Sequence, residues 1–143
     1  MEDDGIGSFV VKELEKMYRN RDDILCIDGG TQGLELMPYF EGMDRCVIID
    51  SIASSMPPGS IGVLRDDEIM KMLKQKMSVH EIGLVDLLGA LELLDRLPQE
   101  VVLVGMVPYS VRFSYGLTSE AKARMPYLIE TVCKEVENGV ATG

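Results

Sequence analysis

Basic residues are scarce in this sequence of 143 residues. Lysine and arginine total 14 against 24 aspartates and glutamates, which gives a formal net charge of -10 at pH 7. Binding to a nucleic acid backbone depends on neutralisation of its phosphates by basic side chains, and an anionic membrane surface also repels an acidic protein. We therefore expect neither nucleic acid nor a membrane as a partner.

Long hydrophobic runs and targeting signals are also lacking. The longest apolar stretch, Val101 to Tyr109, contains glycine and proline and is far shorter than the ~20 residues that cross a bilayer as a helix. The amino terminus reads Met-Glu-Asp-Asp, without the basic n-region and apolar h-region of a secretory signal. We expect a cytoplasmic protein.

Cysteines are few and odd in number. Cys26 and Cys46, two of the three, lie in apolar runs typical of strands, where a reduced thiol serves as a small hydrophobic side chain. The sequence therefore predicts no disulfide framework. With 46% hydrophobic and 27% charged residues, the composition is that of a globular protein, and the length predicts a single domain over residues 1–143.

Hydrophobic periodicity predicts four helices and four strands. Apolar residues at helical spacing predict helices over about residues 5–19, 31–41 and 80–94 and a last helix near the end of the chain. The apolar stripes are Ile6, Phe9, Val10, Leu14 and Met17 on the first helix, Leu84, Leu87, Leu88, Leu91 and Leu94 on the third, and Ala121, Met125, Leu128, Val132 and Val136 on the last. Pro126 is expected to kink or restart that last helix. Short continuous apolar runs predict buried strands at residues 24–28, 46–50 and 101–105 and a further strand at 61–64. The first two strands and the helix between them are expected to form a βαβ unit.

This order of elements predicts an α/β fold with an open, mostly parallel sheet and helices on both faces. Only residues 51–59 separate the second and third strands, too few for a parallel crossover, so the third is expected to be an antiparallel edge strand. Doubly wound sheets normally begin with a strand, whereas this chain begins with a helix. We therefore expect the first strand of the fold to be missing from the front of the chain.

Two aspartates occupy the place where such sheets bind ligands. Asp28 and Asp50 each end a predicted strand, and ligands bind beyond the carboxyl ends of the strands in open α/β sheets. Asp4 would lie beside them if a preceding strand led into the first helix. The alternatives are a helix cap for Asp4 and solvated loop positions for Asp28 and Asp50.

The single histidine, His80, is predicted near the start of a helix, where a capping or packing role is the alternative to a functional one. His80-Glu81 does not begin a zinc-protease motif, because Leu84 occupies the position of the second histidine. The sequence also lacks a G-x-S-x-G nucleophile turn, a G-x-G-x-x-G or P-loop motif, and the lysine that a receiver domain carries after its last strand. The glycines near Asp4 and Asp28 are expected to permit positive φ and close backbone approach at strand-to-helix turns.

With these segments in place, the whole chain resembles the hydrogenase maturation endopeptidases, which remove the carboxy-terminal extension from the large subunit of nickel-iron hydrogenases. The matching motifs are Asp-Asp-Gly-Ile-Gly at 3–7, Asp-Gly-Gly-Thr-Gln-Gly at 28–33, Val-Ile-Ile-Asp at 47–50, Pro-Gly-Ser-Ile at 58–61, Ser-Val-His-Glu-Ile-Gly-Leu at 78–84, Val-Gly-Met-Val-Pro at 104–108 and Gly-Leu-Thr at 116–118. The chain departs from the family at its front, where the family has a strand ending in Gly-Asn-x-Leu.

The resemblance implies roles for particular residues. The three metal-contacting and catalytic positions of the family fall on Asp4, Asp50 and His80. Its glycine-rich signature, which bears on substrate handling, falls on Asp28, Gly29, Gly30, Thr31 and Gly33. The resemblance further implies that nickel arrives already bound to cysteine thiolates of the large-subunit precursor, which is the expected partner.

The residue types agree with a metal-assisted or aspartic-type endopeptidase that depends on nickel. Two carboxylates and one imidazole leave coordination positions open on a borderline divalent ion, and cadmium or zinc could substitute. The metal could polarise the scissile carbonyl or lower the pKa of bound water, with a carboxylate or His80 assisting proton transfer. A binding module that inspects the precursor without cutting it is the alternative, and retention of all three ligand positions favours the protease.

Overall fold

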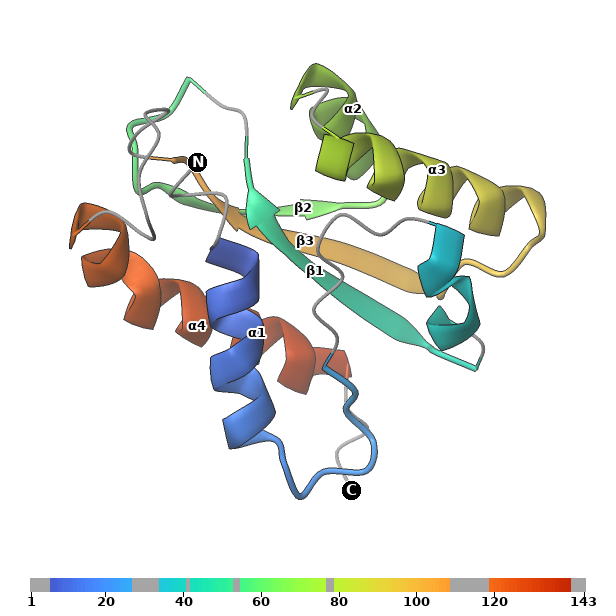
Figure 1. The fold of residues 1–143 in the computed structure, drawn as a ribbon, viewed down its shortest axis with the longest axis horizontal. Helices are drawn as coiled ribbons and strands as arrows, with labels where there is room; N and C mark the ends of the chain where they lie inside the picture. Colours follow the sequence, from blue (N-terminus) through green and yellow to red (C-terminus); the bar gives the residue numbers. More distant parts are fainter. Residues whose placement is uncertain are drawn as a thin grey trace. The chain divides into compact units, whose positions relative to one another are not determined.

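The computed structural model describes residues 6–26, 34–40, 42–52, 55–76, 79–108 and 119–139. Its elements follow the order α1 (Ile6–Met17), η2 (Leu34–Phe40), β1 (Arg45–Ser51), β2 (Ile61–Arg65), α2 (Asp67–Lys76), α3 (Val79–Leu93), β3 (Glu100–Met106) and α4 (Ser119–Gly139) (Figure 1). The chain divides into two compact units. The first contains Met1–Asp28, Ile49–Val63 and Val104–Gly143, and the second contains Gly29–Ile48 and Leu64–Leu103.

Strands β1 and β3 are parallel neighbours in a three-stranded sheet of order β1-β3-β2. At one end of the pair, the Glu100 N–H donates to the Asp44 carbonyl over 3.2 Å, and at the other end the Ile52 N–H donates to the Met106 carbonyl over 3.0 Å. Since both residue numbers increase together along the pair, the two strands end at the same edge. These runs were predicted as strands, and the prediction is confirmed.

Strand β2 is the antiparallel edge strand that the short connection predicted. The Gly59 N–H donates to the Val107 carbonyl over 2.8 Å, whereas Asp66, after the strand, donates its N–H to the Val101 carbonyl over 3.3 Å. The residue numbers of β2 increase while those of β3 decrease, so the sheet is mixed. The α/β fold class with an open sheet and one antiparallel edge strand is therefore confirmed.

Strand β3 is covered on both faces. All residues from Val101 to Met106 are buried, and Leu103 and Val104 are fully so. Because successive side chains of a strand point to opposite faces, this burial requires protein on each side of the strand. The continuous apolar run of β3 is thus the pattern of a central strand, as the sequence indicated.

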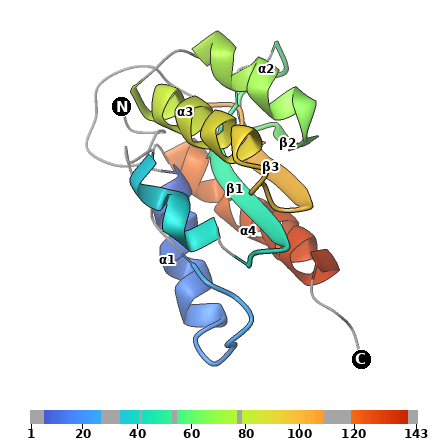
Figure 2. The same ribbon diagram turned by 90° about the vertical axis from the view of Figure 1, so that its right-hand side faces the viewer.

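In the first unit, α1 contacts α4 (Figure 2). Ala121, Met125, Leu128 and Val132 of α4 are buried, which confirms most of its predicted stripe, whereas on α1 burial is confirmed only for Val10 and Leu14. Phe9 and Met17 were also predicted on the α1 stripe, but both are exposed, so the buried stripe is narrower. Helix α4 continues through Pro126, and a restart of the helix there is not observed.

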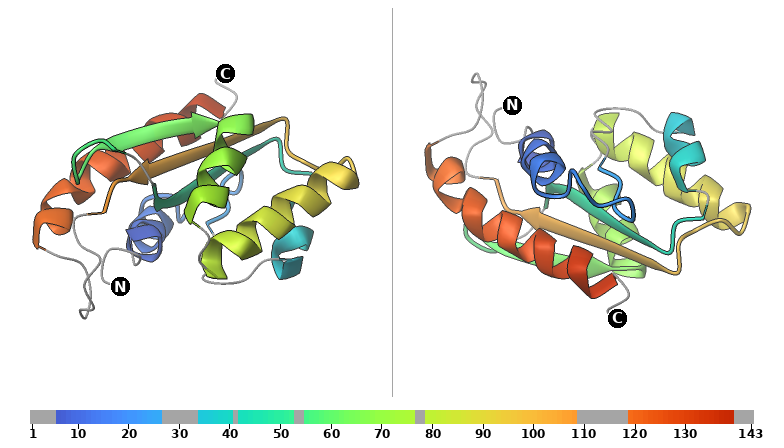
Figure 3. Two further views of the ribbon diagram at one scale, coloured as in Figure 1. Left: turned by 90° about the horizontal axis from the view of Figure 1, so that it is seen from above. Right: turned by 90° about the horizontal axis from the view of Figure 1, so that it is seen from below.

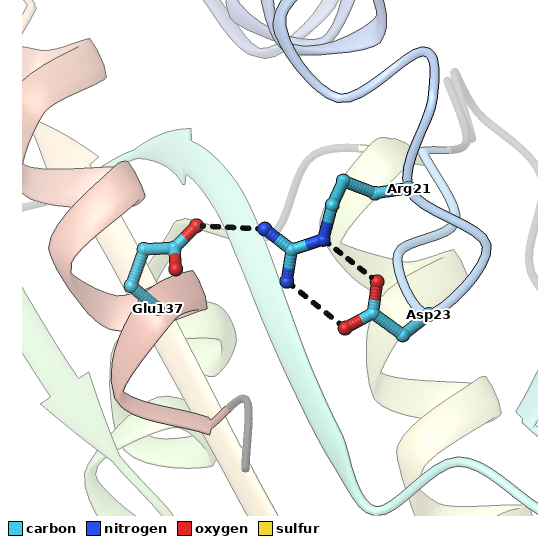
Figure 4. A network of polar contacts seen from close by, with 3 residues as sticks. All are labelled: Arg21, Asp23 and Glu137. Atoms are coloured by element: carbon cyan, nitrogen blue, oxygen red, sulfur yellow. Dashed lines mark hydrogen bonds and ion pairs between the residues drawn. The ribbon is translucent and has the colours of Figure 1, made fainter. Parts of the chain in front are cut away.

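A polar network joins the segment after α1 to the end of α4 (Figure 4). The guanidinium of Arg21 donates two hydrogen bonds of 2.9 Å to the carboxylate of Asp23, and it lies 3.6 Å from the Glu137 carboxylate. All three side chains are exposed, so solvent screens the attraction and the network contributes little to stability.

In the second unit, α3 contacts both α2 and η2 (Figure 3). The leucine face predicted for the helix over residues 80–94 is confirmed at Leu84, Leu87, Leu88 and Leu91, which are buried. Leu94 was predicted on the same face, but it lies beyond the end of α3 and is 54% exposed. Helix α2 was not predicted, although Ile69, Met72 and Leu73 are buried on it at helical spacing. Asp66, with a φ of 51°, separates it sharply from β2.

The prediction of a strand over residues 24–28 is wrong for the part that the structure describes. Ile24, Leu25 and Cys26 belong to no strand, and Leu25 is 62% exposed; Ile27 and Asp28 lie outside the described residues. A short apolar run becomes a strand only where a neighbouring strand accepts its backbone hydrogen bonds. The βαβ unit predicted from this run is therefore not observed.

The helix predicted over residues 31–41 is a 3-10 helix, η2, in its described part, and residues 31–33 and 41 lie outside that part. Pro38 lies within it and has no amide hydrogen to donate to an α-helical ladder.

Across the described stretches, no helix is both long enough and apolar enough to span a membrane.

Candidate functional site

Asp50 is the predicted catalytic and metal-binding residue whose side chain the structure describes. It lies near the end of β1 and is only 7% exposed. Its Oδ1 accepts a hydrogen bond of 2.8 Å from the Ser51 N–H, and its Oδ2 is buried as well. The alternative of a solvated loop position for Asp50 is therefore wrong: the carboxylate is enclosed by protein.

The backbone around Asp50 is fixed by the end of the parallel strand pair. Ile52, two residues further along, donates its N–H to the Met106 carbonyl, and both Ile52 and Met106 are buried. Because β1 and β3 are parallel, their carboxyl ends meet at this edge of the sheet. Asp50 thus lies where open α/β sheets bind their ligands, as the sequence predicted.

The start of α1 packs directly against β1 beside this carboxylate. A Cβ atom on Gly7 would lie only 2.9 Å from the carbonyl oxygen of Ile49, the residue before Asp50. Only glycine permits such an approach without displacing backbone. The expectation of close backbone approach is confirmed at Gly7, three positions after Asp4 in the sequence, whereas the positive φ expected there is not observed.

Asp4 and the glycine-rich segment from Asp28 to Gly33 lie outside the described residues. His80 is the second residue of α3, which confirms its predicted position near the start of a helix. Its side chain lies outside the described part of the structure. His80 belongs to the second compact unit and Asp50 to the first. The convergence of Asp4, Asp50 and His80 therefore stays a prediction.

The described side chains do not by themselves form a metal centre. Within the ranges that the structure describes, no group of three or more histidine, cysteine, aspartate or glutamate side chains could hold a metal ion. Asp4 and the imidazole of His80, two of the three predicted ligands, lie outside the described part of the chain. The proposed set of three ligands therefore stays a prediction. Of its members, Asp50 provides a buried carboxylate that could bind a metal ion.

Neither Cys46 nor Cys26 offers a reactive nucleophile. Burial raises the pKa of the Cys46 thiol to about 12. Burial and, to a smaller extent, the negative charge of Glu15 also raise the pKa of Cys26. A thiol with a raised pKa carries little of the reactive thiolate near neutral pH, which agrees with the expectation that these cysteines are inert.

Two residues near the carboxyl edge were not singled out from the sequence. Gly59 has a φ of 88° and precedes β2, and Arg124 of α4 donates from Nε to the Gly59 carbonyl over 3.1 Å. Gly59 belongs to the Pro-Gly-Ser-Ile motif, which was a signal for the turn. The partner of Arg124 is 65 positions away in the sequence, so nothing in the local pattern indicated this contact.

Comparisons with known proteins identify the family of this chain. The sequence model of the hydrogenase maturation protease family matches residues 9–135. Hydrogenase 2 maturation protease of Escherichia coli K12 is 36% identical over 140 residues, which cover 96% of this chain and 85% of that protein.

Solved structures show the same fold. The hydrogenase maturating endopeptidase HybD from Escherichia coli aligns with a TM-score of 0.88 at 33% identity, over 97% of this chain and 87% of that one. The nickel-iron hydrogenase maturation protease HybD from Thermococcus kodakarensis aligns with a TM-score of 0.74 at 29% identity, over 94% and 90%. With a family match over residues 9–135 and Asp50 at the carboxyl edge of the sheet, this chain belongs to the hydrogenase maturation protease family.

Proposed function

We propose that this chain removes the carboxy-terminal extension from the nickel-loaded large-subunit precursor of a nickel-iron hydrogenase. The observation that carries the proposal is the buried carboxylate of Asp50 at the carboxyl edge of the β1–β3 pair, in a chain of the hydrogenase maturation protease family. The names of its relatives, among them Hydrogenase 2 maturation protease, support the precursor as substrate.

Asp4, Asp50 and His80 are the residues that we propose to contact the nickel of the precursor. Asp50 is suited to this role because the attraction between a buried carboxylate and an arriving cation is strong in a medium of low dielectric constant. The Ser51 N–H holds Oδ1 in one orientation before the precursor arrives. The packing of Gly7 against Ile49 supports the assignment of Asp4, because it brings the start of α1 beside the strand that carries Asp50.

Nickel in this proposal belongs to the substrate, and it defines both the selectivity and the chemistry of the protease. Two carboxylates and an imidazole form a weaker site than histidine-rich zinc centres, so the precursor's cysteine thiolates retain the ion. A divalent ion near the scissile bond polarises the carbonyl group as a Lewis acid. Asp28 and the glycines that follow it, Gly29, Gly30 and Gly33, with Thr31, are proposed to position the precursor.

A cleavage assay tests the proposal most directly. Purified precursor with its extension is prepared with and without nickel, incubated with the protein and analysed by mass spectrometry. We expect loss of the extension from the nickel-loaded precursor alone. Equal cleavage of the nickel-free precursor would contradict the nickel dependence, and binding without cleavage would favour the non-catalytic checkpoint module.

Cadmium provides a separate test of the ligand set. We propose that cadmium, nickel or zinc added to the free protein binds at Asp4, Asp50 and His80, because imidazole suits these ions better than magnesium. Calorimetric titration with cadmium should detect binding to the wild type and its loss in Asp50→Asn. Crystallographic density for cadmium at other residues would show that the ligand assignment is wrong.

A further inference from the structure

Arg124 connects α4 to the turn that precedes β2. Its Nε donates a hydrogen bond of 3.1 Å to the carbonyl oxygen of Gly59, in a partly buried position. The guanidinium carbon lies 4.7 Å from the ring centroid of Tyr127, one turn further along the same helix. The stacking restricts the guanidinium plane, so the donor is aimed at Gly59 before any partner binds.

The residue that Arg124 holds is the centre of a tight turn. The Ser60 N–H donates to the Pro57 carbonyl over 3.1 Å, and Gly59 has a φ of 88°. Pro58 followed by a glycine with positive φ makes this a type II turn, in which a side chain at the position of Gly59 would be strained. Arg124 therefore binds the peptide group whose conformation defines the turn.

The turn is hydrogen-bonded to Val107, the residue after Met106 at the end of β3. Gly59 donates its N–H to the Val107 carbonyl over 2.8 Å, and Val107 donates its N–H to the Ser60 carbonyl over 2.9 Å. Met106, the residue before Val107, accepts the hydrogen bond from Ile52. Ile52 and Gly59 are thus hydrogen-bonded to adjacent residues, Met106 at the end of β3 and Val107 directly after it.

The connection between Ile52 and Gly59 begins two residues after the proposed catalytic carboxylate and presents apolar groups to solvent. Met56 is 60% exposed, and Pro57 and Pro58 are exposed as well. Two prolines reduce the number of conformations open to the chain, and the anchors at Ile52 and Gly59 fix the two ends. Asp50, the anchors, Arg124 and Tyr127 all belong to the first compact unit. Figure 1 shows the start of α4 and the β1–β2 connection at the same end of β3.

We propose that Arg124 is a positioning residue for precursor binding: by holding Gly59, it fixes the Met56–Pro58 segment where that segment contacts the precursor chain next to Asp50. The inference rests on the proposed function and names a further part of the same site. The ligand class is an extended polypeptide with apolar side chains near the scissile bond, because Met56, Pro57 and Pro58 offer apolar surface and no charge. Arg124 itself touches the turn and not the substrate.

If Arg124 positions this segment, its substitution should weaken precursor binding and leave the turnover number almost unchanged. In Arg124→Ala we expect KM for the nickel-loaded precursor, and Kd measured by calorimetry, to rise about tenfold, since a hydrogen bond from a charged group is lost. The turnover number should stay within about twofold, because the chemistry at Asp50 does not use Arg124. Hydrogen exchange should show faster exchange of the Gly59 and Val107 amides.

Two further variants keep the test decisive. Arg124→Lys retains a cationic donor without the planar fork, so it should recover part of the affinity and serves in place of Arg124→Ala if that variant does not fold. Lys122→Ala removes an exposed cation two residues away on the same helix, and it should match the wild type in KM, Kd and exchange.

The outcomes separate this inference from the proposed function. A wild type that neither binds nor cleaves the nickel-loaded precursor rejects the proposed function and with it the role of Arg124. An active wild type whose Arg124 variants keep the wild-type KM and Kd rejects the role of Arg124 alone, whether or not their melting temperature falls. An equal rise in KM for Lys122→Ala would also overturn it, because the effect would then be one of net charge.

Discussion

The Cα of Gly7 faces the carbonyl oxygen of Ile49 so closely that a Cβ on Gly7 would lie 2.9 Å from that oxygen. Both groups are backbone, one in α1 and one in β1, so neither can move aside as a flexible side chain could. We expect Gly7→Ala to lower the free energy of unfolding by about 1–3 kcal/mol, the usual effect of overpacking. Urea denaturation followed by circular dichroism measures this difference.

Gly89 offers a matched control within another helix. A Cβ on Gly89 of α3 would meet nothing within 4 Å. Gly89→Ala should therefore raise stability by about 0.5–1 kcal/mol, because alanine is the better helix former. Equal losses in the two variants would show that the close approach of Gly7 to Ile49 is unimportant.

Asp50→Asn should abolish processing of the nickel-loaded precursor while the protein stays folded. The amide oxygen of asparagine can still accept the hydrogen bond from the Ser51 N–H, so the local structure is retained. The negative charge that we propose to bind nickel is lost, however. Mass spectrometry of the precursor and a thermal melt of the variant measure the two effects separately.

Asp44, the residue directly before β1, supplies the control for that substitution. Asp44 is exposed and precedes β1 at the end opposite to Asp50. Asp44→Asn removes the same charge without touching the proposed site, and it should process precursor at the wild-type rate. A processing rate in Asp50→Asn equal to that of Asp44→Asn would remove Asp50 from the proposed mechanism.

His80→Ala is expected to abolish processing at little cost in stability, because α3 is held by its buried leucines. Leu88→Ala, on the buried face of the same helix, should instead lower the free energy of unfolding by about 2–5 kcal/mol through a cavity. Urea titrations of both variants beside the cleavage assay distinguish these effects. Normal cleavage by His80→Ala would exclude it from the proposed metal site.

The central elements could be predicted from the sequence because their signals are local. The run from Val101 to Met106 is apolar throughout, as a strand buried on both faces must be, and the leucines of α3 repeat at helical spacing. The antiparallel direction of β2 followed from the short connection to β1, a purely geometric limit. Such patterns specify an element without reference to its neighbours.

Other features depend on partners far along the chain, and these were missed. Ile24 to Cys26 have the composition of a strand, but strand formation requires a neighbour to pair with, and Leu25 is left 62% exposed. The apolar residues of α2 are fewer and are mixed with lysines, so its helical pattern was weaker. At the site, Asp50 could be recognised because it ends a strand, whereas Arg124 acts on Gly59, whose position depends on the folded chain.

The buried thiol of Cys46 predicts a loss of stability at alkaline pH. In the unfolded chain this thiol ionises with a pKa near 9.0, whereas burial raises its pKa to about 12 in the folded protein. Between these values the unfolded state releases a proton that the folded state keeps, so the free energy of unfolding falls as pH rises. The contribution is fully present below pH 9.0 and is lost as pH approaches the folded value. One thiol lowers stability by at most about 1.4 kcal/mol per pH unit.

Cys46→Ala isolates this contribution. Tyr18, whose pKa is also raised, by burial and then by its hydrogen bond with Cys133, titrates in the wild type and the variant alike. The difference between their urea unfolding free energies, measured under reducing conditions at several pH values below and above 9.0, therefore reports Cys46 alone. We expect the wild type to lose stability more steeply than Cys46→Ala above that pH, because only the wild type has a thiol that must ionise on unfolding. Parallel curves would mean that the Cys46 thiol ionises as readily in the folded protein as in the unfolded chain, and that the β1 strand leading to Asp50 is open to solvent at this position.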